Sequence, residues 1–389
     1  MKKFKIKSKY IKRIFLSSCI SLAIFSISIN ISKSINNKND IIETTNLNKV
    51  EDIKDDDNLN NKYKSLFENL FDYRNKAILE KDDKSLKDLY ETNKKTGLWA
   101  YEHEIQKMKY LENWSSKQGI KFNDIKTRVK IKKVKQKEDN LYGVICTVST
   151  EYKYSYENQL DKENVFRIGT YHYLNVKIND NNCIITKEWY TDPFADSLNL
   201  ENIKSNDIKE YIMNQQHKEF ELTNEQTKAI EYAHKYCGAA ADEEYGMKFN
   251  SKYKNYNPEG GDCANYASQI MFESGRFKKN PTWNYEDNEG TKSWVNAQAF
   301  KNYILYSGRG SLISKGTYQD VYKQAYNLKP GDFVAYEKGG RITHVSTVTG
   351  VDSKGYPLVT CHNSDRLLVP WDLGWSDKSI KFHLIQVHY

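Results

Sequence analysis

Several features that would identify common classes of protein are missing from this 389-residue sequence. Only 6 Pro and 19 Gly are present, which is too few for a collagen-like or Pro/Gly-rich disordered chain. The six cysteines form no C-x-x-C pair, so a zinc ribbon or a thioredoxin-type motif is excluded. The chain has no Gly-rich phosphate loop, and its 8 His include no H-E-x-x-H pair. The sequence therefore implies no metal and no cofactor.

The positive charge of the chain is confined to its first 34 residues. The formal net charge is +8, from 59 basic and 51 acidic residues. Residues 1–34 contain no acid and eight of the basic residues: Lys2, Lys3, Lys5, Lys7, Lys9, Lys12, Arg13 and Lys33. Removing these eight from the 59 leaves 51, equal to the acidic total. A neutral remainder gives no electrostatic reason to expect nucleic acid as a partner.

The same segment has the layout of an export signal. Basic residues up to Arg13 precede an uncharged, partly apolar stretch over 14–31. We expect 1–34 to be a signal peptide or an N-terminal membrane anchor, followed by a polar, disordered linker over 35–60. The expected location is secreted, extracellular or associated with the cell wall. Membrane contact is expected only through an N-terminus that is not cleaved.

The number of cysteines left after the leader is odd. Removing Cys19 leaves five: Cys146, Cys183, Cys237, Cys263 and Cys361. In an exported protein an odd count leaves at least one thiol outside any disulfide. We expect the free, reactive one to be Cys263.

Residues 61–194 are predicted to form an α+β accessory domain. Helical spacing begins at Tyr63 and recurs over 99–114, with Gly97 as a break before it and Gly119 as its end. Period-two alternation then predicts antiparallel strands over 129–131, 141–154, 165–178 and 183–190. This order is similar to that of cystatin- or NTF2-like modules. A spacer or wall-docking role is favoured over a ligand pocket.

A helical linker over 195–222 is expected to lead into a second α+β domain, 223–389. Thr223 to Gln226 has the pattern of a capping box. Further along, Gly260-Gly261 permits a close approach of the backbone, and Asp262 suits the N-cap of a helix that begins at Cys263. A thiol in the first turn of a helix is expected to have a lowered pKa and to act as a nucleophile.

A candidate base follows in a three-strand meander over 333–336, 342–349 and 356–363. His344 lies near the start of the middle strand. With a four-residue loop over 352–355, His344 would oppose Asn363; with an odd loop it would oppose His362. Either residue could orient the ring of His344, and pairing alone does not decide between them.

Five ordered motifs in this domain resemble the bacterial putative amidase-domain family. They are Gly-Gly-Asp-Cys-Ala-Asn-Tyr-Ala-Ser-Gln at 260–269, Thr-Lys-Ser-Trp-Val-Asn-Ala at 291–297, Lys-Pro-Gly-Asp at 329–332, the strand of His344, and Cys-His-Asn-Ser-Asp-Arg at 361–366. That family looks like a branch of the papain-like cysteine hydrolases, alongside the CHAP and NlpC-type cell-wall enzymes. The resemblance covers 223–389 and implies a papain-like domain in which a helix bearing the nucleophile packs on a small antiparallel sheet. It favours His362 over Asn363 as the third catalytic residue.

The resemblance also implies a reaction. The substrate would be an amide bond of peptidoglycan, either the link between N-acetylmuramic acid and alanine or a bond within the stem peptide. Cys263 would attack the carbonyl and form an acyl-enzyme, with His344 as base and His362 as third member. Asn363 and Asp262 would be possible third members or supporting residues. Four tryptophans, Trp283, Trp294, Trp371 and Trp375, are candidates for lining a glycan groove, although the helical spacing around Trp294 favours a core position for it.

Two other functions fit the same residues. One is a transglutaminase-like or protein-directed Cys-His peptidase, which differs only in acceptor or substrate. The other is a wall-bound binding protein without catalysis, against which the intact pair Cys263 and His344 argues.

Overall fold

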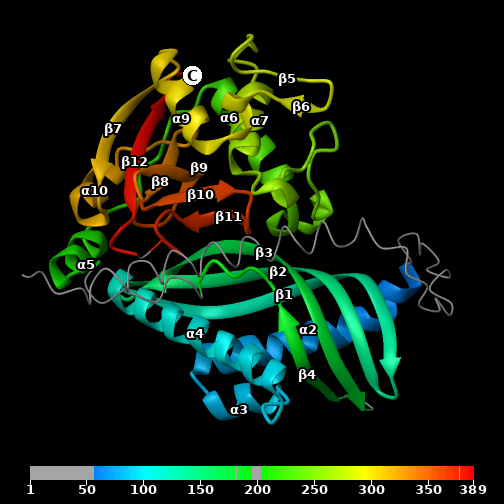
Figure 1. The fold of residues 1–389 in the computed structure, drawn as a ribbon. Helices are drawn as coiled ribbons and strands as arrows, with labels where there is room; N and C mark the ends of the chain where they lie inside the picture. Colours follow the sequence, from blue (N-terminus) through cyan, green and yellow to red (C-terminus); the bar gives the residue numbers. More distant parts are fainter. Residues whose placement is uncertain (1–56, 180–181, 195–202, 376) are drawn as a thin grey trace, which may run out of the picture. The chain divides into compact units, whose positions relative to one another are not determined.

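The computed structural model describes residues 57–179, 182–194, 203–375 and 377–389 (Figure 1). The predicted export segment, 1–34, and nearly all of the predicted linker, 35–60, lie outside these residues. Within the described ranges, no helix is both long enough and apolar enough to cross a membrane.

The accessory part consists of helices against one face of a long antiparallel sheet (Figure 1). Its helices are α2 (Asp57–Glu80), α3 (Asp83–Asp88) and α4 (Lys95–Gln118), and its strands are β1 (Ile120–Glu138), β2 (Leu141–Tyr156), β3 (Gln159–Asn179) and β4 (Asn182–Trp189). Gly119 ends α4 in a left-handed conformation, with φ 75°, as predicted. The predicted break at Gly97 is wrong: Gly97 lies in the first turn of α4, where a Cβ would come within 2.3 Å of the Glu91 carbonyl oxygen.

The C-terminal part carries helices on both sides of a second group of strands. After α5 (Asn206–Met213), its helices are α6 (Asn224–Lys235), α7 (Cys263–Glu273), α8 (Lys292–Val295), α9 (Ala297–Tyr306) and α10 (Tyr318–Ala325). Its main strands are β7 (Gly310–Gly316), β8 (Phe333–Lys338), β9 (Arg341–Val351), β10 (Pro357–Cys361), β11 (Asp365–Pro370) and β12 (Lys381–Val387); β5 (Tyr285–Glu286) and β6 (Glu289–Gly290) form a separate small pair. The capping box of Thr223 and Gln226 at the start of α6 is confirmed.

The two groups of strands form one antiparallel sheet with the order β1-β2-β3-β11-β10-β9-β8-β12-β7. β4 and β11 share the same edge of β3: β4 pairs with its C-terminal half, and β11 pairs with residues 167–169. Gly169 stands at this junction, where a Cβ would lie 2.4 Å from the Cβ of Ala239. The α+β class is confirmed, whereas the domain boundaries stay a prediction.

Pairing between β8 and β9 decides which side chains can reach α7. Ala335 pairs with Val345, and both belong to the apolar cluster that contains Cys263. Tyr336 pairs with His344, and Tyr336 packs in the cluster of the other face. Because paired residues share a face and neighbours alternate, His344 and Cys263 lie on opposite sides of the sheet.

Buried carboxylates join the accessory part to the C-terminal part. Asp352 accepts hydrogen bonds from the hydroxyls of Tyr154 at 3.0 Å and Tyr156 at 2.6 Å. Asp372 lies 2.7 Å from the Lys204 ammonium and accepts a hydrogen bond from Trp114 Nε1 at 3.1 Å. Burial raises the pKa of Asp352, so the ionised carboxylate depends on these donors.

We expect Tyr156→Phe to weaken this junction. The substitution removes the shorter donor to a buried carboxylate and should lower the free energy of unfolding by about 1–3 kcal/mol. Urea unfolding of the full chain measures the change. Tyr306→Phe is the matched control, since Tyr306 is 89% exposed. An unchanged midpoint for Tyr156→Phe would show that the hydroxyl contributes nothing.

Candidate active site

Cys263 is the first residue of α7 and follows two glycines with positive φ. Gly260 has φ 115° and Gly261 has φ 139°. The first helical hydrogen bond runs from Tyr266 N to Asp262 O at 2.9 Å, so the N–H groups of the first turn have no helical carbonyl as partner. The backbone N–H groups of Val345 and Ala264 face the Cys263 sulfur. The thiol therefore lies among backbone donors, at the place where β9 passes the start of α7.

Asp262 holds three segments at the start of this helix. One carboxylate oxygen accepts hydrogen bonds from Tyr256 N and Asn265 Nδ2, both at 2.8 Å. The other oxygen lies 2.5 Å from Nδ1 of His362. Asp262 occupies the N-cap position as predicted, but its side chain makes no cap hydrogen bond, because these three partners take its oxygens.

Asn363 completes the contact between this loop and the β10–β11 turn. Its Oδ1 accepts a hydrogen bond from Asp262 N at 2.5 Å. Asn363 itself has a positive φ of 71°. A Cβ on Gly261 would lie 2.3 Å from Asn363 Nδ2, so the predicted close approach at the glycine pair is confirmed at Gly261.

The His362 ring is fixed on all sides. It stacks on Tyr266 with centroids 3.6 Å apart, and it contacts Phe249 edge-on. Its Nε2 donates to Tyr236 O at 2.9 Å. A carbonyl only accepts, so Nε2 carries a proton, and Nδ1 faces the Asp262 carboxylate. Both ring nitrogens are thus engaged.

His344 immediately precedes Val345, whose N–H faces the Cys263 sulfur, but its side chain makes other contacts. Its Nε2 is 3.1 Å from Ser346 Oγ and 3.3 Å from Cys361 Sγ, and its ring stacks on Trp375. Among the residues that the structure describes, no hydrogen bond joins His344 to Cys263. The structure therefore brings Cys263, Asp262, His362 and Asn363 together and leaves His344 on the opposite face of the sheet.

The end of β10 at Cys361 explains why neither predicted partner reaches His344. Val351 pairs with Pro357 rather than Tyr356, but a bulge at Thr349 returns the strands to the register of the four-residue loop, in which Thr347 pairs with Thr360 and His344 would oppose Asn363. β10 then ends at Cys361, and the chain turns toward Asp262. Sequence reasoning missed Cys361, which follows Thr360 along β10 and contacts His344. In the register of the four-residue loop Cys361 would oppose Ser346, which shares a face with His344, so strand alternation in that register indicates this contact.

Burial dominates the acid–base chemistry of the site. It raises the pKa of the Cys263 thiol to about 12, although the N–H groups of Val345 and Ala264 oppose the shift. The predicted lowering of this pKa is therefore wrong for the closed structure. Burial also lowers the pKa of His344 to about 3, with Arg366 as a second cause. At neutral pH the thiol is protonated and the His344 ring is neutral.

The cysteines and tryptophans correct two further expectations. All five cysteines of the described residues are free and buried, so Cys263 is not singled out by being unpaired.

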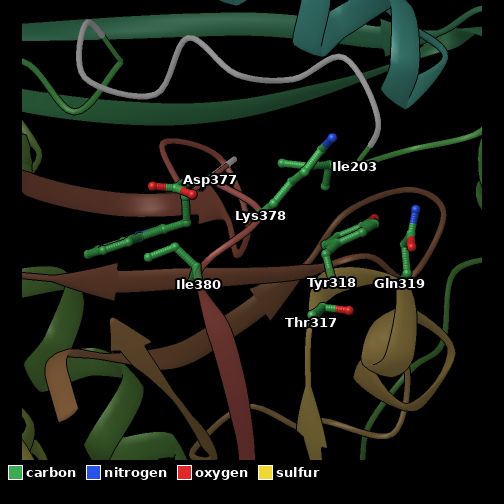
Figure 2. Close-up of a pocket in the computed structure, with 8 residues that line it drawn as sticks. Ile203, Thr317, Tyr318, Gln319, Asp377, Lys378 and Ile380 are labelled. Atoms are coloured by element: carbon green, nitrogen blue, oxygen red, sulfur yellow. The ribbon is translucent and has the colours of Figure 1, made fainter. Parts of the chain in front are cut away.

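Trp283, Trp294 and Trp371 are fully buried, which confirms a core position for Trp294 and excludes all three from a groove. Trp375 is partly exposed and lines a cavity of about 240 Å³, shown in Figure 2. The other lining residues are Ile203, Thr317, Tyr318, Gln319, Asp377, Lys378 and Ile380.

Comparison with known proteins gives one family and one relative. Residues 223–385 match the family model described as "Putative amidase domain". This match covers less than half of the chain, and it indicates a hydrolase. The curated relative is "Uncharacterized protein YjcM" of Bacillus subtilis (strain 168), 34% identical over 148 residues, which are 35% of this chain and 32% of the relative. No solved structure matches.

Alkylation tests the protonation of Cys263. With a pKa raised to about 12, the rate of its reaction with iodoacetamide should rise with pH through 9 without reaching a plateau. Peptide mass mapping of the full chain measures this rate residue by residue. Cys183, whose pKa burial raises to about 11, is the internal comparison. A plateau below pH 8 for Cys263 would contradict the closed geometry.

A pair of glycine variants tests the contact with Asn363. Gly260→Ala and Gly261→Ala both place a side chain at positive φ, but only the second meets Asn363. We expect Gly261→Ala to be the less stable by about 1 kcal/mol, because displacing Asn363 breaks its hydrogen bond to Asp262. Urea midpoints of the two variants compare them directly. Equal urea midpoints would show that Asn363 can move away from residue 261 without a loss of stability.

Proposed function

We propose that residues 223–385 form a cysteine-dependent hydrolase of amide bonds, with Cys263 as the nucleophile. The observation that carries this proposal is the place of Cys263. It begins α7 beneath the backbone N–H of Val345, directly after the Asp262 that fixes the helix start, within the segment that matches an amidase family. Backbone donors at a sulfur stabilise a thiolate and a neighbouring oxyanion.

The proposed reaction is acyl transfer in two steps. The thiol loses its proton to a histidine as the sulfur attacks the amide carbonyl, and the Cys263 N–H stabilises the oxyanion. Collapse of the tetrahedral intermediate breaks the C–N bond, and the histidine returns the proton to the leaving amine. Water then attacks the thioester, which releases the acid and the free thiol.

His344 is the proposed base, and His362 is the proposed third member. His362 has both nitrogens engaged and its ring packed by Tyr266 and Phe249, which suits a group that holds the site in place. His344 is neutral, but burial lowers its pKa to about 3 and makes it a weak base where it lies, so the proposal requires the ring to leave this buried position. To reach Cys263, the side chain of His344 must move to the other face of the sheet. The pairing of β8 and β9 is irregular at Thr343, and this irregularity is where the register of β9 could change. A shift of one residue there moves His344 to the side of α7.

The proposed substrate is an amide of peptidoglycan, and the proposed location is outside the cell. Support comes from the resemblance of five motifs to the putative amidase-domain family, which looks like a relative of cell-wall hydrolases, and from the basic, then uncharged, leader. The rival substrates, a protein amide or a transglutaminase-type acceptor, use the same residues. A non-catalytic wall-binding protein would show no dependence on Cys263.

Hydrolysis of purified peptidoglycan by the full chain tests the proposal. Wild type should release new amino groups, and Cys263→Ala should lower the rate at least about 10³-fold, because it removes the nucleophile. Cys183→Ala, a buried cysteine of the accessory part, is the matched control and should retain activity. No release by wild type, on peptidoglycan or on peptide amides, would remove the hydrolase proposal.

Two more variants assign the remaining roles. His344→Ala should lower the rate nearly as far as Cys263→Ala, because His362, the other histidine near the site, has both ring nitrogens engaged. Cys361→Ala separates the two cysteines, since Cys361 is the one that contacts His344 in the closed structure. Loss of activity in Cys361→Ala together with an active Cys263→Ala would transfer the nucleophile to Cys361.

A further inference from the structure

A separate pocket lies in the accessory part, between α4 and β4. Its volume is about 630 Å³, within the range of about 300–1,000 Å³ typical of small-molecule sites. Thr96, Trp99, Ala100 and His103 line it from α4, and residues 187–192 line it from the end of β4 and the segment that follows. None of these residues belongs to the candidate active site.

The rim of this pocket carries exposed aromatic rings. Trp99 is 57% exposed and Trp189 is 60% exposed, whereas Trp114, Trp283, Trp294 and Trp371 are fully buried. Tyr173, 51% exposed, tilts against Trp189 with ring centroids 5.7 Å apart. Indole rings are large and apolar, and folding normally buries them. Two exposed indole rings at the rim of one pocket therefore indicate a surface that binds a ligand.

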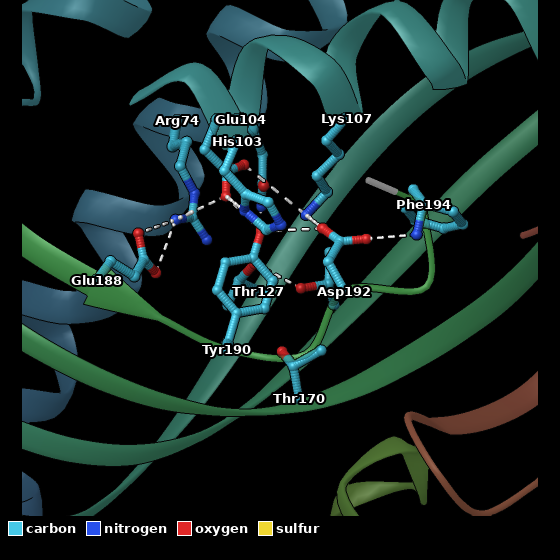
Figure 3. Close-up of polar contacts among 12 residues, drawn as sticks. Arg74, His103, Glu104, Lys107, Thr127, Thr170, Glu188, Tyr190, Asp192 and Phe194 are labelled. Carbon is cyan, nitrogen blue, oxygen red and sulfur yellow. Dashed lines mark hydrogen bonds and ion pairs between the residues drawn. The ribbon is translucent and has the colours of Figure 1, made fainter. Parts of the chain in front are cut away.

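The floor of the pocket is polar and its charges nearly balance. His103, Glu188, Tyr190 and Asp192 line the pocket. Figure 3 shows their polar contacts with the neighbouring side chains of Arg74, Glu104 and Lys107. Arg74 lies 3.0 Å from Glu188, and Lys107 lies 3.6 Å from Asp192. The side chain of His103 remains 28% exposed. Glu104 Oε2 is buried and accepts no hydrogen bond, although Lys107 is 3.9 Å away.

This combination favours a neutral ligand with one flat apolar face and several hydroxyl groups. A phosphate would require an excess of positive charge, but three carboxylates face two buried cations here. A cationic ligand would be repelled by Lys95, whose ammonium already lies 4.5 Å from the centre of the Trp99 ring, over one of its two faces. A sugar ring packs its apolar face on an indole and offers donors and acceptors at its edge.

We propose that the pocket of Trp99 and Trp189 binds a saccharide. The apolar faces of sugar rings contact the two indoles, and their hydroxyls reach the partly exposed ring of His103. This site goes beyond the proposed hydrolase, and its binding does not depend on Cys263. It replaces the glycan groove that the sequence suggested among the C-terminal tryptophans.

Calorimetric titration of the full chain carrying Cys263→Ala tests the proposal without turnover. The probe is a tetramer of N-acetylglucosamine, with a tetramer of glucose as a second arm. Saturable binding of either supports a saccharide site, and their ratio reports whether the acetamido group is recognised. No binding of either, or binding of inorganic phosphate in their place, overturns it.

Variants of the rim locate the site. Trp99→Ala and Trp189→Ala should each weaken binding at least about tenfold, since each removes a stacking surface. Trp99→Phe should retain more binding than Trp99→Ala, because a flat ring remains. Tyr306→Ala, at an exposed aromatic of α9, is the control and should bind as the parent does. Equal binding by all four variants overturns the assignment.

A final comparison separates this proposal from the hydrolase. On the wild-type background, Trp99→Ala should hydrolyse a small soluble peptide amide at the parent rate. If the hydrolase proposal is wrong, the chain would still bind the saccharide but would not hydrolyse the amide. If the saccharide proposal is wrong, the chain would still hydrolyse the small amide but would not bind the saccharide.

Discussion

The carboxylate of Asp262 is the constraint on which the candidate active site depends. It joins the loop at Tyr256, the helix at Asn265 and the β10–β11 turn at His362. Asp262 is only 2% exposed, and a buried carboxylate is tolerated only with its lone pairs satisfied. Tyr256 and Asn265 lie within six residues of Asp262, whereas His362 is 100 residues away, so the contact with His362 supplies the tertiary constraint on the position of Cys263. The local sequence around the cysteine starts the helix but does not hold it in place.

Helix starts and ends could be predicted from the sequence, because neighbouring residues determine them. Features that depend on tertiary packing could not. The start of α7, the capping box at Thr223 and the helix end at Gly119 follow from neighbouring residues, and all three are present. The partner of His344 could not be predicted, because β10 ends at Cys361, before the residue that would oppose His344. The pKa of Cys263 was predicted in the wrong direction, because the helix N-terminus is visible in the sequence whereas the depth of burial is not.

The segment that matches the amidase family is built into a larger sheet. β11 pairs with β3, and Asp352 takes hydroxyl donors from two tyrosines of β2. An isolated C-terminal part would expose a strand edge and leave Asp352 without these donors. The accessory part is therefore a structural neighbour of the candidate site, in addition to carrying its own pocket. Neither relation could be inferred from the order of elements, since β3 and β11 are separated by almost two hundred residues.

The five free thiols have a consequence for the lifetime of the protein. Each is buried, and burial raises the pKa of each one, so very little thiolate exists while the fold is closed. Oxidants attack thiolates far faster than thiols. The folded chain thus shields its own sulfur atoms, including the one proposed for catalysis, and needs no disulfide to persist. Oxidative inactivation would proceed through brief openings of the fold, and the frequency of those openings would set its rate.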